Sequence, residues 1–184
     1  LSVTKGVINQ AIDENCDMII SHHPLFFIPF EFNKNIPIYS AHTNLDATKD
    51  GTTDALISLL EMAPSQNVET FLRLVELDEE ISLDALIYQI KSKLKINTLR
   101  VVNNSNKQKI KKIVFCAGSG AGFLEDVQKT RADVFVTGDI KYHTAVDSGI
   151  ILIDIGHFES ERPVLKTLKK LLKSLNLEVM IADE

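Results

Sequence analysis

Short apolar segments alternate with helix-like segments along most of this chain, and this alternation restricts the fold more than any other feature. Helical spacing of apolar residues at 4–14 precedes the apolar run 17–21 (DMIIS), and a second short strand is predicted at 37–41. An uninterrupted apolar run is typical of a strand that is covered on both faces. Strands that alternate with helices indicate an α/β protein with a parallel or mixed sheet.

The same alternation continues to the end of the sequence. Further strands are predicted at 71–77, 98–102, 110–116, 134–137, 150–154 and 178–182. Helices are predicted at 52–62, 82–94, after the loop 117–122 to about 130, from 141, and 160–175. Ser82 and Ser160 are the predicted N-caps, and Pro163 would fall in the first turn of the last helix, where its missing N–H is harmless. The stretch 70–110 has its own strand–helix–strand pattern and is a candidate second subdomain.

Composition excludes several classes of protein. The 184 residues carry a net charge of −5, and such an acidic chain is a poor general binder of nucleic acid. Cys16 and Cys116 have no C-x-x-C spacing, so we expect buried thiols and a cytoplasmic protein, with one disulfide as the alternative. No run is long enough for a transmembrane helix. Because the chain starts at Leu1, we expect a fragment or the ordered part of a longer protein.

The five histidines all lie near predicted strand ends: His22, His23, His42, His143 and His157. The carboxyl ends of strands are where open α/β sheets bind ligands. This shared placement indicates a site rather than scattered surface residues.

Adjacent His22 and His23 end the first apolar run, in the sequence SHHPL. Neighbouring side chains at a strand end point in opposite directions, so the pair suits two metal ions better than one. A turn with two surface imidazoles is the alternative.

In AHTNLD, Asp46 is a hard oxygen ligand, although Asp46 and Asn44 are also common turn formers. We interpret His42 as a proton-transfer or supporting group rather than a ligand.

The segment GHFESE supplies His157 at the end of a strand and Glu161 at the predicted start of a helix. A glutamate there could bridge two metals, or could simply complement the helix dipole. Glu159 is a rival ligand that precedes the predicted cap.

Two further segments remain open in role. GDIKYH offers Asp139, Lys141, Tyr142 and His143 for substrate binding or proton transfer, or as an ordinary helix start. The glycine-rich loop 118–122 lacks both the G-x-G-x-x-G pattern and a Walker lysine. We therefore interpret that loop as a tight turn, with phosphate binding as the lesser alternative.

The predicted ligand set is His22, His23, Asp46, His157 and Glu161. A nitrogen and oxygen set without cysteine favours an open catalytic site over a structural zinc site. Two metals about 3.5–4 Å apart could clamp the attacking and leaving oxygens of a hydrolysis. The metal could be Zn, Fe, Mn or Ni.

The ordered motifs SHHPL, AHTNLD, GDIKYH and GHFESE resemble the NIF-three-like family, whose bacterial members are often labelled GTP cyclohydrolase I type 2 homologues. The resemblance extends over nearly the whole chain and includes FLRLVEL and the CAGSG loop. It implies a dinuclear metal centre on the same five residues, a toroidal homohexamer, and two interlinked α/β domains. We accordingly expect layered α/β/α architecture with mixed sheets, and domains of residues 1–68 with 156–184 and of residues 69–155.

The family label implies hydrolytic opening of the guanine imidazole ring of GTP. Another nucleotide or phosphoester could serve the same metals, with His42 or His143 moving protons. The alternative is a metal-binding regulatory or interaction protein whose ring encloses a partner.

Overall fold

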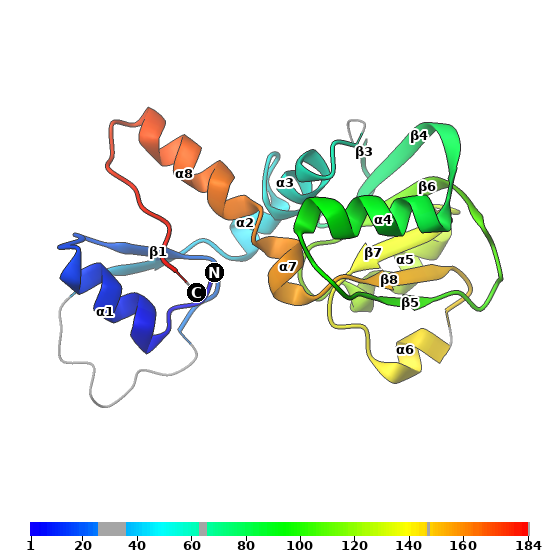
Figure 1. Ribbon diagram of the computed structural model, residues 1–184, viewed down its shortest axis with the longest axis horizontal. Helices are drawn as coiled ribbons and strands as arrows, with labels where there is room; N and C mark the ends of the chain where they lie inside the picture. Colours follow the sequence, from blue (N-terminus) through cyan, green and yellow to red (C-terminus); the bar gives the residue numbers. More distant parts are fainter. Residues whose placement is uncertain (26–35, 63–65, 147, 184) are drawn as a thin grey trace. The chain divides into compact units, whose positions relative to one another are not determined.

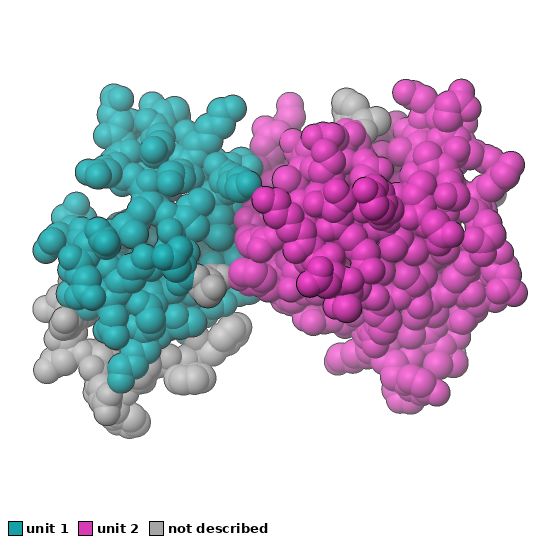
Figure 2. Space-filling view, viewed as in Figure 1, with its two compact units in different colours: residues 1–48, 165–184 teal, residues 49–164 magenta. Residues whose placement is uncertain are grey.

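The computed structural model describes residues 1–25, 36–62, 66–146 and 148–183. The chain forms two compact units, coloured separately in Figure 2. The terminal unit contains residues 1–48 and 165–184, and the central unit contains residues 49–164. The chain leaves the terminal unit and returns to it, so the two units are interlinked as predicted.

The terminal unit contains a small parallel sheet and an amphipathic helix. β1 (Ile19–Ser21) pairs with β2 (Ile38–Ser40), and α1 (Lys5–Asp13) packs against the sheet. The Thr4 hydroxyl caps α1 by accepting a hydrogen bond from the Val7 N–H at 3.2 Å. The unit also holds α2 (Thr43–Ala47) and nearly all of α8 (Val164–Ser174).

A mixed six-stranded sheet forms the middle of the central unit, in the order β3-β4-β6-β7-β8-β5 (Figure 1). Its strands are β3 (Gln66–Asn67), β4 (Arg73–Ser82), β5 (Arg100–Val102), β6 (Lys109–Phe115), β7 (Val134–Thr137) and β8 (Ile151–Asp154). Strands β6, β7 and β8 are parallel, and the other pairs are antiparallel. The helices are α3 (Thr52–Leu59), α4 (Leu83–Leu94), the 3₁₀ turn η1 (Ala121–Phe123), α5 (Leu124–Lys129), α6 (Tyr142–Val146) and α7 (His157–Glu161).

Helices cover both faces of this sheet because its central strands are apolar on both sides. Ile113 and Val134 pack with α3 and α4 in one core, whereas Val114 and Phe135 pack with α5 in another. Successive residues of a strand point to opposite faces, so a continuous apolar run builds two cores. The α/β class, the mixed sheet and the layered α/β/α arrangement are therefore confirmed.

The C-terminal part of the chain differs from prediction at three points. Ser160 does not cap a long helix; it lies inside α7, whose N-cap is Gly156. Pro163 separates α7 from α8, because it has no N–H to continue the helical hydrogen bonds. The predicted strand 178–182 is irregular in the structure, since no described strand pairs with it.

The two units share their discontinuous character with the predicted domains but differ from them in extent. Residues 49–68 and 156–164 belong to the central unit, whereas the prediction placed them with the chain termini. The units are defined by the density of contacts within them, so the predicted domain boundaries stay a prediction. In the part of the chain that the structure describes, no helix is both long and apolar enough to cross a membrane.

Candidate metal centre

Three histidines gather at one edge of the terminal unit's sheet. His22 and His23 follow β1, and His42 follows β2. The two strands are parallel neighbours, so their carboxyl ends lie side by side. The ring centroid of His22 lies 4.9 Å from that of His23 and 5.1 Å from that of His42. One ring nitrogen from each histidine falls within 4.8 Å of the others, which is close enough for a shared metal ion.

His22 is held in the orientation of a metal ligand. Its side chain is buried, and Nδ1 lies 2.8 Å from the carbonyl oxygen of Ala41. A carbonyl can only accept a hydrogen bond, so Nδ1 is the donor, and in a neutral ring Nε2 would then carry the lone pair. That Nε2 lies 3.5 Å from Asp46 Oδ1. His23 has a similar support, because its Nδ1 lies 2.9 Å from the Ser2 hydroxyl.

Asp46 reaches this cluster from the short helix α2 rather than from a non-helical loop. His42 is the N-cap residue of α2, and the Asp46 N–H donates to the His42 carbonyl oxygen at 3.1 Å. The motif AHTNLD is thus a strand end followed by one helical turn. This turn carries the Asp46 carboxylate back to His22, at the edge where β1 and β2 end.

His157 and Glu161 form the corresponding pair in the central unit. They are the first and last residues of α7, and a separation of four places both side chains on one helix face. His157 Nε2 lies 3.0 Å from Glu161 Oε1, and His157 Nδ1 lies 2.7 Å from Asp139 Oδ2. The sequence placed Glu161 at the start of a helix; it instead ends α7, so the predicted dipole role is wrong for that helix.

The glycine-rich loop after β6 supports Glu161. Gly118 has a φ of +70°, and a Cβ at this position would come within 2.4 Å of Glu161 Oε1. The Gly118 N–H donates to Ser160 Oγ at 2.8 Å, and Ser160 Oγ donates to the His157 carbonyl oxygen at 2.7 Å. The loop is thus a tight turn, as predicted, and the absence of a side chain at Gly118 leaves room for the Glu161 carboxylate.

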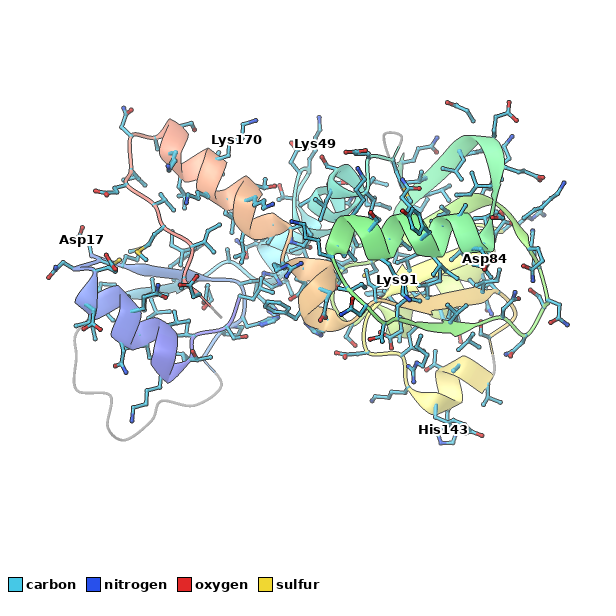
Figure 3. The ribbon with its side chains drawn as sticks, in the orientation of Figure 1. Asp17, Lys49, Asp84, Lys91, His143 and Lys170 are labelled. Carbon is cyan, nitrogen blue, oxygen red and sulfur yellow. The ribbon has the colours of Figure 1, made fainter. Side chains whose placement is uncertain are left out.

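Two other candidates lie elsewhere in the central unit. His143 is exposed on α6, where its ring centroid lies 5.3 Å from that of Tyr142, and Figure 3 shows it pointing away from the sheet. Its predicted role in catalysis stays a prediction. Glu159 folds over the backbone of Gly156, since a Cβ on that glycine would meet Glu159 Oε2 at 2.1 Å. The rival assignment of Glu159 as ligand is therefore not supported by its placement.

The residues fit a divalent metal on chemical grounds. In both His22 and His157, Nδ1 is hydrogen-bonded to an oxygen atom and Nε2 lies near a carboxylate. Metal-ligating histidines typically have this arrangement, with the ring nitrogen opposite the metal hydrogen-bonded to a carbonyl or carboxylate. The space that Gly118 leaves for Glu161 agrees with the same use. The described residues therefore include histidines and carboxylates that could hold a metal ion, as predicted in outline.

Sequence reasoning did not identify Gly118 or Ser160 as supporting residues, and it did not identify the contact of Asp139 with His157. A Gly-Asp pair directly after a strand was the available signal for Asp139. For Gly118 and Ser160, the roles depend on which loop faces α7, and no local pattern encodes that.

Comparison with known proteins gives a consistent family. The family model described as Duf34/NIF3 (NGG1p interacting factor 3) matches residues 1–184. A GTP cyclohydrolase 1 type 2 homolog of Clostridium acetobutylicum is 35% identical over 94% of this chain and 74% of its own length. A protein of Helicobacter pylori named GTP cyclohydrolase 1 type 2 is 36% identical over 90% of this chain and 73% of its own length.

A solved structure agrees with the sequence matches. The crystal structure of Staphylococcus aureus protein SA1388 has a TM-score of 0.83 at 29% identity. The similarity covers 95% of this chain and 78% of the S. aureus chain.

Proposed function

This chain belongs to the DUF34/NIF3 family, and we propose on that premise that it is a hydrolase that depends on two divalent metal ions. The proposed ligands are His22, His23, Asp46, His157 and Glu161. The proposed substrate class is a nucleotide, with hydrolytic opening of the guanine ring of GTP as the leading reaction.

The arrangement that His22 and His157 share carries this proposal. In each ring, Nδ1 is hydrogen-bonded to an oxygen atom. The partner of His22 is Ala41 O at 2.8 Å, and the partner of His157 is Asp139 Oδ2 at 2.7 Å. Each Nε2 lies near a carboxylate oxygen, at 3.5 Å and 3.0 Å respectively. An imidazole lone pair beside a carboxylate offers a divalent cation one nitrogen and one oxygen ligand. Two such pairs support two ions better than one.

The ligand types fit a catalytic centre. When bound, two ions would act as Lewis acids that polarise the substrate and make a water molecule more acidic. Histidine and carboxylate ligands accept Zn, Fe, Mn or Ni, and the metal taken up follows availability as well as affinity. The names of the relatives from C. acetobutylicum and H. pylori favour a nucleotide such as GTP over a general phosphoester.

His42 and His143 are the proposed proton-transfer groups. His42 lies beside His22 and His23, so its ring is near the ligand atoms of the terminal unit. His143 is exposed on α6 and would act only on a substrate that extends to that helix. His42 is therefore the stronger of the two candidates. The toroidal homohexamer stays a prediction from family resemblance.

The proposal is tested with Glu161→Gln, which keeps the size of the side chain and removes its charge. We expect the wild-type chain to bind about two Zn²⁺ ions after reconstitution, and Glu161→Gln to lose at least one. Hydrolysis of GTP should fall by about 10²-fold or more. Metal content is measured by elemental analysis, and turnover by chromatography of a nucleotide and phosphoester panel.

Glu125→Gln is the matched control, because Glu125 is an exposed carboxylate in the first turn of α5. It should bind metal and react as the wild type does. Less than one metal per wild-type chain would contradict the metal centre. Full metal loading without turnover of any substrate in the panel would instead favour the regulatory or interaction role; the family description contains the words interacting factor.

A further inference from the structure

Asp139 lies beside His157 and has a left-handed backbone conformation, which asparagine, aspartate and glycine adopt more often than other residues. Its φ is +55°, in the left-handed region, where the Cβ of an L residue is crowded. Glycine would occupy this position without strain. Strained residues of this kind cluster at functional sites, where the surrounding structure holds them in place.

The surrounding structure fixes Asp139 on both sides. The preceding residue, Gly138, donates its N–H to Gly118 O at 2.8 Å. The following residue, Ile140, donates its N–H to Asp154 Oδ2 at 3.1 Å. The backbone of Gly138 also passes so close to that of His157 that a Cβ on Gly138 would lie 2.8 Å from the backbone nitrogen of His157. This close approach brings the Asp139 carboxylate to the His157 ring.

His157 lies between two carboxylates that differ in exposure. Asp139 Oδ2 is 2.7 Å from Nδ1 and Glu161 Oε1 is 3.0 Å from Nε2. The Glu161 side chain is 5% exposed, whereas that of Asp139 is 56% exposed. A neutral imidazole has one N–H and one lone pair, so a proton donated to Asp139 leaves the lone pair of Nε2 facing Glu161. The buried side of the ring is then the side that presents a metal ligand.

We propose that Asp139 is a positioning residue that fixes the tautomer and orientation of His157 for metal binding. This inference rests on the proposed metal centre and adds a residue to it that does not touch the metal. Carboxylate partners of ligating histidines raise the basicity of the ligand and hold its ring in place, and their loss typically lowers metal affinity by about 10–100-fold. On this view the left-handed conformation is retained because it lets the Asp139 carboxylate reach His157 Nδ1.

The decisive variant is Asp139→Gly in the full chain. It removes the carboxylate and suits the backbone conformation, so relieved strain should offset the greater entropy of the unfolded chain and leave the metal-free protein about as stable as the wild type. Its Zn²⁺ affinity, measured by competition with a chromophoric chelator, should fall by about 10–100-fold. Asp139→Asn keeps an oxygen that can accept from Nδ1, and asparagine tolerates left-handed backbone, so its affinity should lie between the two.

Asp50→Gly is the matched control. Asp50 is exposed and has a φ of +63°, so the same substitution is made at the same backbone conformation. In this control, relief of backbone strain should change the free energy of unfolding in urea, whereas the Zn²⁺ affinity should stay the same.

A second readout is the ¹⁵N chemical shifts of the His157 ring in the metal-free protein. They should show the proton on Nδ1 in the wild type and a loss of that preference in Asp139→Gly.

The outcomes separate this inference from the proposed function. Wild-type affinity and wild-type ring shifts in Asp139→Gly would overturn the positioning role while leaving the metal centre intact. A fall in affinity accompanied by an equal destabilisation of the metal-free protein would make Asp139 structural and would also overturn it. If the wild type bound no Zn²⁺, the proposed function would fall, and the positioning role for a metal ligand would fall with it.

Discussion

The ligand candidates could be predicted from the sequence because each is a chemically distinctive residue at the end of a strand. Within the terminal unit, the structure groups His22, His23 and His42, and places Asp46 within 3.5 Å of His22. The supporting residues could not be predicted, because their roles arise from contacts between loops distant in sequence. Gly118, for example, matters through its approach to Glu161.

His42 poses a question at the scale of a single residue, because its ring joins a group that could bind metal. Among the described residues its ring makes no hydrogen bond, whereas His22 and His23 each have a partner at Nδ1. A ring without such a partner is better suited to proton transfer than to ligation. His42→Ala should therefore lower turnover by about 10²–10⁴-fold while Zn²⁺ affinity changes only a few-fold.

The measurement pairs steady-state kinetics with chelator competition on the same preparation. His22→Ala is the matched comparison, since it removes a proposed ligand from the same cluster and should lower both quantities. A fall in Zn²⁺ affinity for His42→Ala as large as that for His22→Ala would make His42 a ligand instead.

At the scale of elements, prediction succeeded where a local pattern decides the structure. The strand 134–137 has the same bounds in the structure, and Ser82 caps α4 by accepting from the Ala85 N–H at 3.1 Å. Prediction failed at the junction of α7 and α8. There Gly156, with a φ of +86°, starts the one-turn helix α7. The apolar spacing of α8 directly after it makes the two helices look like one in the sequence. The strand predicted at 178–182 failed for another reason: a strand needs a neighbour, which sequence periodicity does not supply.

Asp133 joins β6 to the start of β7 and gives the sheet a pH dependence. Burial alone would raise the pKa of its carboxyl. The hydrogen bond from the Lys107 ammonium and those from the Lys112 and Lys111 backbone N–H groups outweigh burial, so the pKa lies below its ordinary value of 3.8. The two backbone donors lie 2.8 Å and 2.7 Å from Oδ2.

A lowered pKa means that the charged carboxylate favours the folded state. Its contribution is complete above pH 3.8 and is lost as the pH falls through the lower pKa of the folded protein. Asp133→Asn should therefore lower the free energy of unfolding by about 1–2 kcal/mol at neutral pH and by less near pH ~3. Urea unfolding at the two pH values measures the difference.

Asp126→Asn is the control for this prediction, because Asp126 pairs with Lys129 on the exposed surface of α5. Exposed pairs contribute little, so this variant should unfold as the wild type does at either pH. A loss in Asp133→Asn that is the same at both pH values would show that packing rather than charge is responsible.

For the whole molecule, the α/β class followed from the order of elements, whereas the division into units did not. The composition along the chain changes little at residues 48 and 164, where the terminal and central units meet in sequence. Only the pattern of contacts separates α3 and α7 from the terminal unit. Three of the five proposed ligands belong to the terminal unit and two to the central unit.

Metal bound by the proposed ligands of a unit has a consequence for the stability of that unit. A metal that binds only the folded state stabilises it by about 2.7 kcal/mol at a free concentration 100 times Kd. If the proposed ligands of each unit bind metal, Zn²⁺ should slow amide hydrogen exchange in both units relative to protein treated with a chelator. The peptides to follow by mass spectrometry are those of α1 and β1 in the terminal unit and of β7 and β8 in the central unit. Glu161→Gln should lose the protection of β7 and β8, whereas Glu125→Gln should keep it. Protection confined to α1 and β1 in the wild type would show instead that the terminal unit binds metal by itself, and the five-residue ligand set would then be wrong.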